Sequence, residues 1–313
     1  MCLEVTSVQV AQPVEDDGEG RVSFTRLLGE IRPRLHRYCS RMAGSAVDGE
    51  DIVQDVLVKA VGAFEDARID NIESWLFRIA HHTAIDFLRH RRRQDQFSSD
   101  EDPDMTIDET ASSDGRHVAA ASLRTYMQLP VAQRGCVILM DVLGYSLQEV
   151  GCTIGLSVPA VKAALHRGRT RLREIASQPD LMAVPALSQE DSRRLSIYVE
   201  RFNSRDFDAV RDMLADDVRL ELVARTRMEG RDQVSRYFHN YSGIHDWHFT
   251  PGLVDRRPAL LVTNPNDLTA RPTYFVLIEW SGDNIVGIRD FRHARYVAES
   301  AEMVMFGSVA GSP

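Results

Sequence analysis

One stretch of the chain, residues 144–175, constrains the fold more than any other: GYSLQEVGCTIGLSVPAVKAALHRGRTRLREI. Residues 147–154 are predicted to form a short helix, Gly155 permits a tight turn, and Ser157 caps a second helix that runs to about Ile175. Apolar residues at three- and four-residue steps would pack the two helices against each other. The pattern predicts a helix-turn-helix with a basic last helix, the arrangement that places a helix in the major groove of DNA.

The charge of the chain is distributed unevenly. With 37 basic and 46 acidic residues among 313, the formal net charge is -9. Residues 21–95 nevertheless carry a net +2 and residues 118–176 a net +4, whereas residues 96–117 carry -6 and residues 177–313 carry -4. This asymmetry indicates a polyanion, above all nucleic acid, as the partner of the basic segments. In the last helix of the helix-turn-helix, the side chains expected to face DNA are Lys162, His166, Arg167 and Arg169.

A helix is predicted over residues 48–64, DGEDIVQDVLVKAVGAF, because its apolar residues recur at three- and four-residue steps. Asp48 is expected to cap this helix, with acids in the first turn, where the helix dipole favours them. The polar face carries Glu50, Gln54, Asp55 and Lys59. Spacing alone favours a solvated surface here over a binding surface.

A further helix is predicted in NIESWLFRIAHHTAIDFLRHRRRQ, with Asn71 or Ser74 as its cap. Four basic side chains lie close to one side of it: Arg78, His82, Arg89 and Arg93. Such a stripe suits phosphate contacts, and Trp75 is available to stack on unpaired bases. The pattern fits a solvated, basic helix end equally well.

Composition divides the chain into segments. Residues 96–117 are rich in acids and serines and nearly free of large apolar residues, which is typical of a flexible linker. Further on, helices are followed by a run of strands, which predicts an α+β domain with a curved antiparallel sheet around a helix. We expect a disordered tail at 1–20, all-α domains at 21–95 and 118–176, linkers at 96–117 and 177–189, the α+β domain at 190–300, and a tail at 301–313.

In the last domain, a helix is expected at 231–240 and strands within 245–254, 273–283 and 284–297. We expect residues 190–300 to contact the two all-α domains and hold a compact form. The acidic balance of residues 177–313 against the basic residues 118–176 favours such a contact, mostly through screened surface charges.

Several classes of protein are disfavoured. Cys2, Cys39, Cys136 and Cys152 lie far apart, which argues against a zinc ribbon or a disulfide framework. No apolar run reaches the roughly 18 residues of a membrane span, and residues 1–20 lack the pattern of a signal peptide, so we expect a cytoplasmic location. We expect no metal, no cofactor and no catalytic residue.

Three segments in this order resemble the bacterial sigma-70 family, in its small extracytoplasmic-function (ECF) group. DGEDIVQDVLVKAVGAF resembles the segment that docks on the β′ clamp helices of RNA polymerase. SWLFRIAHHTAIDFLRHRRR resembles the helix that opens and reads the -10 promoter element, and LPVAQRGCVILMDVLGYSLQEVGCTIGLSVPAVKAALHRGRTRLRE resembles the helix-turn-helix that reads the -35 element. Residues 21–95 then correspond to sigma region 2 and residues 118–176 to region 4.

The resemblance implies roles for the candidate residues. The partners would be core RNA polymerase, through its β′ clamp helices and β flap, and promoter DNA, with the acidic linker threading toward the polymerase active centre. His81 and His82 replace a common Arg-Asn pair, and Ala164 replaces a common basic residue, so the promoter sequence stays open. The implied sites are Asp51, Gln54 and Asp55 for polymerase; Trp75, Arg78, His82, Arg89 and Arg93 for the -10 element; and Lys162, His166, Arg167 and Arg169 for the -35 element.

The last third resembles the SnoaL-like, nuclear-transport-factor-like fold, which is fused to some members of this group. The resemblance rests on FNSRDFDAVRDMLADDVRLE, on the EGRDQVSRYF helix and on the strands that follow. In that fold a cone-shaped barrel encloses a pocket, where a small-molecule ligand would bind. Ordinary core packing is the favoured alternative for the residues that would line it here: Tyr237, Tyr241, Trp247, Tyr274 and His293.

We therefore interpret the chain as an alternative sigma factor that binds core polymerase and initiates transcription, with its activity modulated by the fused C-terminal domain. A one-component regulator, which binds an operator alone and senses a ligand, is the main alternative, but it gives no reason for the docking helix. A SnoaL-like enzyme with a tethered DNA-binding module is disfavoured because the sequence offers no convincing acid/base pair.

Overall fold

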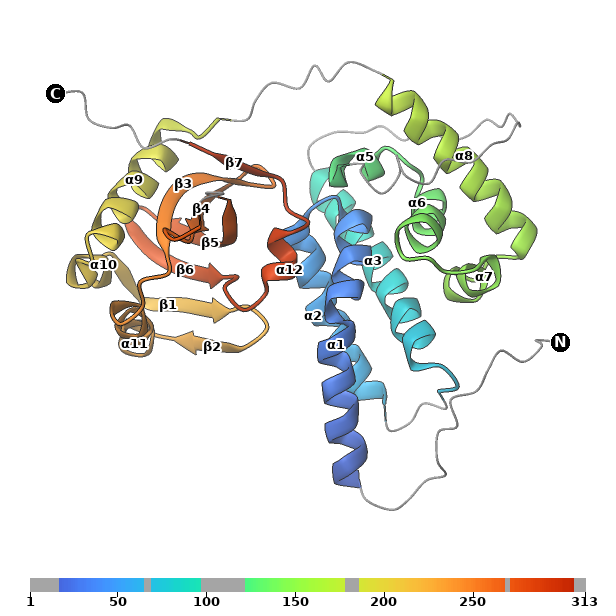
Figure 1. Cartoon of the computed structure of the whole chain (residues 1–313), viewed down its shortest axis with the longest axis horizontal. Helices are drawn as coiled ribbons and strands as arrows, with labels where there is room; N and C mark the ends of the chain where they lie inside the picture. Colours follow the sequence, from blue (N-terminus) through green and yellow to red (C-terminus); the bar gives the residue numbers. More distant parts are fainter. Residues whose placement is uncertain (1–16, 65–68, 97–121, 178–185, 268–270, 307–313) are drawn as a thin grey trace.

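The structure is a computed structural model with two helical parts and one part built on a sheet (Figure 1). The expected acidic linker, apart from Gln96, and the expected N-terminal tail, apart from residues 17–20, lie outside the described residues. The structure describes residues 17–64, 69–96, 122–177, 186–267 and 271–306.

The first helical part consists of α1 (Asp17–Ala43), α2 (Ala46–Ala63) and α3 (Ile72–Gln96). Ser45 caps α2, because its hydroxyl accepts a hydrogen bond from the Asp48 N–H at 3.2 Å. Asp48 lies in the first turn of the helix, so the expectation that Asp48 is the cap is wrong. Of the two expected cap candidates for α3, the cap is Asn71 and not Ser74, since the Asn71 side chain accepts from the Ser74 N–H at 2.9 Å.

The second helical part contains the predicted helix-turn-helix. The helices α7 (Leu147–Ile154) and α8 (Val158–Ala176) are joined at Gly155, whose φ of +78° favours glycine. Ser157 caps α8 through the Ala160 N–H. These local signals were all readable in the sequence. The elements that precede them are α5 (Leu123–Met127), α6 (Val131–Val137) and a π-helical turn, η1 (Ile138–Val142).

The two helical parts share one hydrophobic core. Arg134 of α6 is buried in it, and its guanidinium donates hydrogen bonds to the carbonyls of Met42 (2.6 Å) and Leu129 (2.9 Å). Burial lowers the pKa of Arg134 to about 10. The Tyr145 hydroxyl, just before α7, donates to the Glu73 carboxylate of α3. The helix-turn-helix is therefore held against α1 and α3.

The C-terminal domain, residues 186–306 of the described chain, contains one mixed sheet in the order β2-β1-β6-β5-β4-β3-β7. Its helices are α9 (Gln189–Asn203), α10 (Phe207–Asp212), α11 (Arg231–Ser242) and α12 (Arg295–Ala298). Its strands are β1 (Leu214–Leu222), β2 (Thr226–Glu229), β3 (His248–Val254), β4 (Arg257–Thr263), β5 (Pro272–Ser281), β6 (Asn284–Asp290) and β7 (Met303–Met305).

This sheet departs from the expected antiparallel run. β1 pairs with β6 in parallel, with Leu220 opposite Ile288. β4 was not predicted, and β7 lies in the expected C-terminal tail, where it pairs with β3. The expected strand 284–297 ends at Asp290, because the Asp290 carboxylate accepts from the Arg292 N–H at 2.8 Å and turns the chain toward α12.

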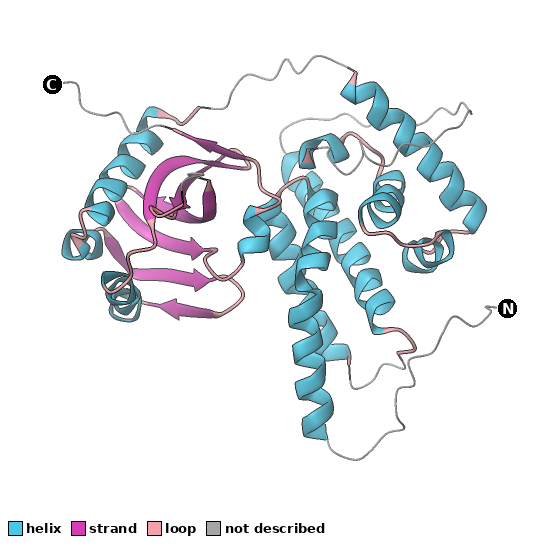
Figure 2. Cartoon of the chain, in the orientation of Figure 1, coloured by secondary structure: helices cyan, strands magenta, loops and turns pink. Residues whose placement is uncertain are grey.

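Both faces of this sheet are buried, and Figure 2 shows the sheet between helices of its own domain and the helical parts. On one face, Tyr274, Val276 and Ile278 of β5 pack with α9 and α11 in the core of the C-terminal domain. On the other face, Phe275 and Leu277 belong to a second cluster that includes α12. Side chains from the helical parts complete this second cluster: Ala46 and Val47 of α2 and Leu123 of α5.

Candidate nucleic-acid and protein interfaces

The C-terminal domain rests on the start of α2. The turn between β3 and β4 places Asp255 and Arg256 at φ of +47° and +66°, and this tight turn aims the Asp255 carboxylate at the end of the helix. One oxygen of Asp255 accepts hydrogen bonds from the Ser45 hydroxyl (2.9 Å) and from the N–H groups of Ala46 (2.6 Å) and Val47 (3.3 Å). A carboxylate there satisfies free N–H groups and complements the helix dipole. Asp255 therefore acts as an additional cap, supplied by another domain.

Glu50 of α2 is fully buried beneath this contact. The Arg32 guanidinium of α1 donates to the Glu50 carboxylate at 3.1 Å, and the Tyr296 hydroxyl of α12 donates to its other oxygen at 2.9 Å. Burial raises the pKa of Glu50, although Arg32 opposes that shift. The sequence had favoured a solvated position for Glu50, and the structure corrects this because α12 covers it.

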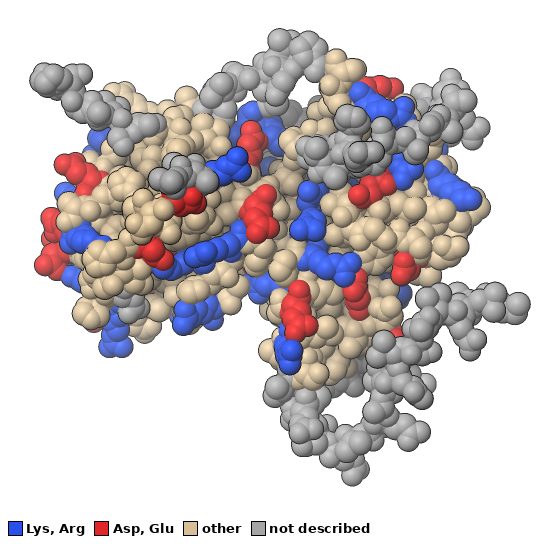
Figure 3. All heavy atoms as spheres, in the orientation of Figure 1, with Lys and Arg blue, Asp and Glu red and all other residues tan. Residues whose placement is uncertain are grey.

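Two of the three expected polymerase-binding residues are also held by the C-terminal domain. The Arg289 guanidinium of β6 lies 2.6 Å from one Asp51 oxygen. The side chain of Gln54 donates to Glu221 at 2.9 Å and accepts from Arg227 at 2.9 Å. Burial raises the pKa of Asp51, with Arg289 acting in the opposite direction. Side chains of both signs meet along the seam between the C-terminal domain and the helices (Figure 3).

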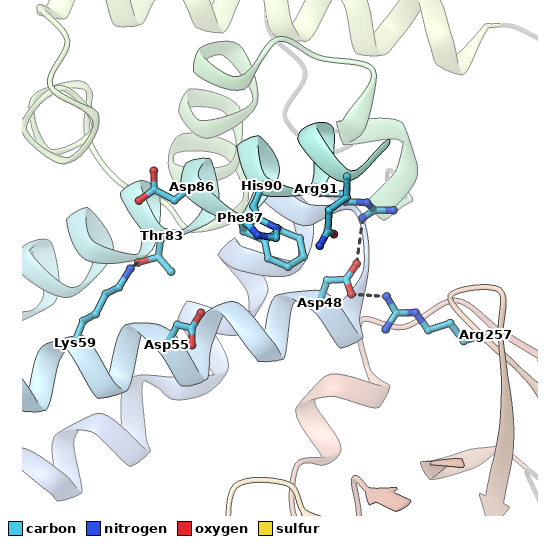
Figure 4. A pocket seen from close by; sticks show the side chains of 10 residues that line it. Asp48, Asp55, Lys59, Thr83, Asp86, Phe87, His90, Arg91 and Arg257 are labelled. Atoms are coloured by element: carbon cyan, nitrogen blue, oxygen red, sulfur yellow. Dashed lines mark hydrogen bonds and ion pairs between the residues drawn. The ribbon is translucent and has the colours of Figure 1, made fainter. Parts of the chain in front are cut away.

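The third expected residue, Asp55, is exposed, and it lines a cavity of about 510 Å³ between α2 and α3 (Figure 4). At one end of this cavity, Asp48 forms ion pairs with Arg91 of α3 (3.2 Å) and with Arg257 of β4. The Lys59 ammonium donates to the Thr83 hydroxyl across the cavity at 3.0 Å. The contact of the C-terminal domain with the polar face of α2 thus reaches Gln54 and leaves Asp55 open.

The basic stripe of α3 lies on the surface. Its four members are exposed: Arg78, His82, Arg89 and Arg93. Trp75 is half-buried, and its ring lies near that of Phe24, with 6.5 Å between centroids. The structure therefore brings the four basic side chains to one accessible surface and places Trp75 partly in the core beside it.

The four candidates on α8 differ in their surroundings. Lys162 is exposed, whereas His166 and Arg167 are half-buried. Arg169 forms an ion pair with Asp141 of η1, with 2.9 Å between its Nε and the carboxylate. Hydrogen bonding to Asp141 raises the pKa of Arg169. Arg169 is thus ion-paired within the protein, whereas its position on the helix predicted a side chain that faces DNA.

Four of the five expected pocket residues come together in the C-terminal domain. Tyr237, Tyr241, Trp247 and Tyr274 are buried in one aromatic cluster. His293 lies apart from it, exposed, and hydrogen bonds with Arg225 at 3.0 Å. Tyr237 and Trp247 pack their rings on that of Tyr241, and the Tyr274 hydroxyl lies 3.4 Å from the Tyr241 hydroxyl, an arrangement that fits ordinary core packing.

Sequence reasoning missed the carboxylate at the centre of this cluster. Asp290 is fully buried at the end of β6 and accepts hydrogen bonds from the hydroxyls of Tyr237 (2.7 Å) and Tyr241 (2.8 Å). Burial raises its pKa. An acid that ends the apolar strand NIVGIRD was the available signal. In the described part of the chain, no group of histidine, cysteine and acidic side chains is arranged to hold a metal ion.

These features define a two-part helical protein with a helix-turn-helix and an accessible basic helix, joined to an α+β domain. Residues 27–94 match the Sigma-70 region 2 family, residues 123–172 match Sigma-70 region 4, and residues 196–286 match the SnoaL-like domain family. The RNA polymerase sigma factor CarQ of Myxococcus xanthus is 30% identical over 166 residues, which cover 51% of this chain and 92% of CarQ. The chain belongs to the ECF group of RNA polymerase sigma factors.

Other similarities extend further along the chain. The ECF sigma factor SigG of Mycobacterium tuberculosis is 29% identical over 239 residues, and the match covers 68% of this chain and 64% of SigG. The crystal structure of the M. tuberculosis ECF sigma factor SigJ has a TM-score of 0.33 at 19% identity, covering 86% of this chain and 95% of SigJ. Membership of this family agrees with the expectation that the chain is not an enzyme. None of the described helices has the length and apolar character needed to cross a membrane.

Proposed function

We propose that this chain is an alternative sigma factor whose C-terminal domain covers part of the surface by which it docks on core RNA polymerase. The docking face consists of Asp51, Gln54 and Asp55 on one side of α2. One observation carries the proposal: Arg289 and Arg227 of the C-terminal domain already occupy Asp51 and Gln54. The same side-chain atoms cannot serve two partners at once, so polymerase and the C-terminal domain compete.

Several kinds of contact hold the C-terminal domain against α2. Its centre is apolar, where Ala46 and Val47 pack with the second face of the sheet, and an apolar centre is typical of stable interfaces. Around it lie the Asp255 cap and the ion pairs of Asp48 and Asp51. Because the two partners belong to one chain, their effective concentration is on the order of millimolar, so moderate contacts suffice to hold the covered form.

The promoter-binding residues have a different relation to this form. We propose that the α3 stripe reads the -10 element and that α8 reads the -35 element. These elements lie roughly 25 base pairs apart, or about 85 Å at 3.4 Å per base pair. In the shared core α7 packs near α3, so α8 cannot reach that far from α3. We therefore infer that the described form is a resting form and that the two helical parts separate on the promoter.

The proposal can be tested by removing the contacts that the C-terminal domain makes with α2, without changing any residue of α2. The release variant Asp255→Asn/Arg257→Gln/Arg289→Gln removes three contacts on the C-terminal side of the interface. Asp232→Asn/Arg219→Gln/Arg236→Gln changes the charge equally at exposed positions of the same domain and serves as the control. We expect the release variant to bind purified core polymerase at least about tenfold more tightly, because tenfold corresponds to about 1.4 kcal/mol and each of the three lost contacts contributes at least about 0.5 kcal/mol.

Two results would contradict the proposal. Equal affinity of the release variant, the control and the wild type for core polymerase would show that the C-terminal domain does not compete. Tight binding of operator-like DNA without polymerase, together with no binding to core polymerase, would favour a one-component regulator instead.

A further inference from the structure

The docking helix α2 carries an exposed apolar patch next to the covered surface. Val58 is 73% exposed and Val61 is 45% exposed. In the described part of the chain, the exposed large hydrophobic residues are Val58, Val61, Met127 and Met305. Single exposed apolar side chains are common and need no explanation. Here two of them lie within one turn of the helix proposed to dock on polymerase.

These valines continue the face that the C-terminal domain covers. Steps of three or four residues lead from Asp51 to the adjacent pair Gln54 and Asp55, then to Val58 and on to Val61, so these residues form one stripe along α2. The first two residues of the stripe are bonded to the C-terminal domain. The last three are exposed. The cover therefore ends partway along a continuous surface.

The uncovered end has the chemistry of an interface. An apolar patch beside a carboxylate matches the common pattern of an apolar centre with a polar rim. Val58 contributes little to the core of its own helical part, because most of its surface faces solvent. The covered end of the same stripe already shows that this surface accepts a protein partner bearing arginines.

We infer that Asp55, Val58 and Val61 form the site at which core RNA polymerase first contacts the covered protein, before the C-terminal domain leaves. This inference rests on the proposed docking face. Polymerase first binds the exposed end of the stripe. It then forms contacts with Gln54 and Asp51, which replace their contacts with Arg227 and Arg289 of the C-terminal domain. Polymerase is thus itself the agent that opens the protein.

This order of events has a kinetic consequence. If polymerase binds first, the rate at which the C-terminal domain leaves rises with polymerase concentration. If the domain must leave before polymerase can bind, the rate at high polymerase concentration levels off at the rate of spontaneous opening. The two orders can be separated without changing any residue of the covered interface.

The experiment measures release by energy transfer in the full chain. Dyes are attached to Arg26→Cys on α1 and Arg236→Cys on α11, both exposed positions, in a chain whose Cys2 and Cys152 are replaced by serine. Rapid mixing with increasing core polymerase gives the release rate. We expect a rate that rises with polymerase concentration and a slope about tenfold lower for Val58→Asp and Val61→Asp. Ala63→Asp adds the same charge on another side of α2 and should leave the slope unchanged.

Each other outcome has a definite meaning. A release rate that levels off and is the same in Val58→Asp overturns the inference but leaves the competition between polymerase and the C-terminal domain intact. Polymerase binding without any loss of energy transfer overturns the proposed function as well. If Val58→Asp instead converts a dimer to a monomer in light scattering, the patch binds a second copy of the chain and the inference is wrong. Energy transfer before mixing must equal that of the wild type, which verifies that the variants fold and remain covered.

Discussion

The neighbouring helices α2 and α3 carry the two expected functional surfaces of region 2, and the C-terminal domain covers only one of them. On α2, Asp51 and Gln54 are bonded to Arg289 and Arg227. On α3, the basic stripe that begins at Arg78 remains exposed. Under the proposed function, this difference means that the covered form withholds the protein from polymerase more than from DNA. Control of this kind would be sufficient, because unpaired -10 bases become available for stacking only after the promoter has been opened.

The charges that each domain brings to the contact differ from those expected from the net charges of the segments. The sequence predicted a contact between the C-terminal domain and both helical domains, and the net charges attributed its attraction to the basic residues 118–176. In the structure, arginines of the C-terminal domain contact acids of α2 instead, as in the pairs Arg257–Asp48 and Arg289–Asp51. Net charge sums over a whole surface, whereas close contacts are decided by the few side chains within about one Debye length. The few arginines at this contact therefore outweigh the acids elsewhere in the domain.

The largest effect should come from reversing charges on α2. We expect Asp51→Lys and Asp55→Lys each to weaken binding of core polymerase by about 100-fold, which corresponds to about 2.7 kcal/mol, a usual loss for a disrupted interfacial charge pair. Only Asp51→Lys should also release the C-terminal domain, because Asp51 pairs with Arg289 and Asp55 is exposed. Pull-down of core polymerase and energy transfer within the chain measure the two effects separately.

If both variants bind core polymerase as the wild type does, and circular dichroism shows that they are folded, then Asp51 and Asp55 do not belong to the docking face. Release of the C-terminal domain by both variants would mean that the cover extends further along α2 than Gln54.

The open surface on α3 gives the next largest effect. We expect Arg89→Ala/Arg93→Ala to lower promoter opening by about tenfold, because two phosphate contacts are lost, and to reduce the salt dependence of binding by a slope of about 2. Permanganate reactivity of unpaired thymines measures the opening. Since the C-terminal domain does not cover the stripe, we expect the same roughly tenfold loss of promoter opening in the wild-type background and in the release-variant background. An effect seen only in the release variant would show that α3 is masked as well.

The sequence predicted the elements with local signals better than the contacts between domains. Ser157 and Gly155 are short-range signals for a cap and a turn, and both were identified correctly. Asp51 and Glu50 each have a partner more than two hundred residues away, Arg289 for Asp51 and Tyr296 for Glu50. No periodicity along α2 can reveal them, so a face that looked solvated is an interface.

One signal for the interface was present in the last domain. The run YFVLI in β5 has no polar residue, whereas a sheet with one solvated face alternates apolar and polar residues. Such a run predicts burial on both faces, and the second face is indeed completed by α2 and α5. The mixed pairing of β1 with β6 could not be predicted in the same way, because strand order depends on the path of the whole domain.

Loss of the additional cap should have a smaller effect. We expect Asp255→Asn to shift the balance toward the open form by about fivefold, since losing a capping carboxylate costs about 1 kcal/mol. Hydrogen exchange should become faster at the N–H groups of Ala46 and Val47, which Asp255 accepts from. Asp232→Asn, at an exposed position of α11, is the control. Exchange that stays unchanged at both N–H groups would show that the cap does not contribute to the cover.

The smallest effect concerns α8, where the structure separates two residues that the sequence treated alike. Lys162 is exposed, so Lys162→Ala should lower -35-dependent transcription about threefold through the loss of one direct contact, with little change in thermal stability. Arg169 is held by the buried Asp141, so Arg169→Ala should lower the free energy of unfolding by about 1–2 kcal/mol, because it leaves that carboxylate without its partner. Replacing Asp141 by Asn in the Arg169→Ala background should recover part of the lost stability. If Arg169→Ala instead keeps full stability and loses -35 dependence as strongly as Lys162→Ala, then Arg169 leaves Asp141 on the promoter, and the ion pair belongs to the resting form alone.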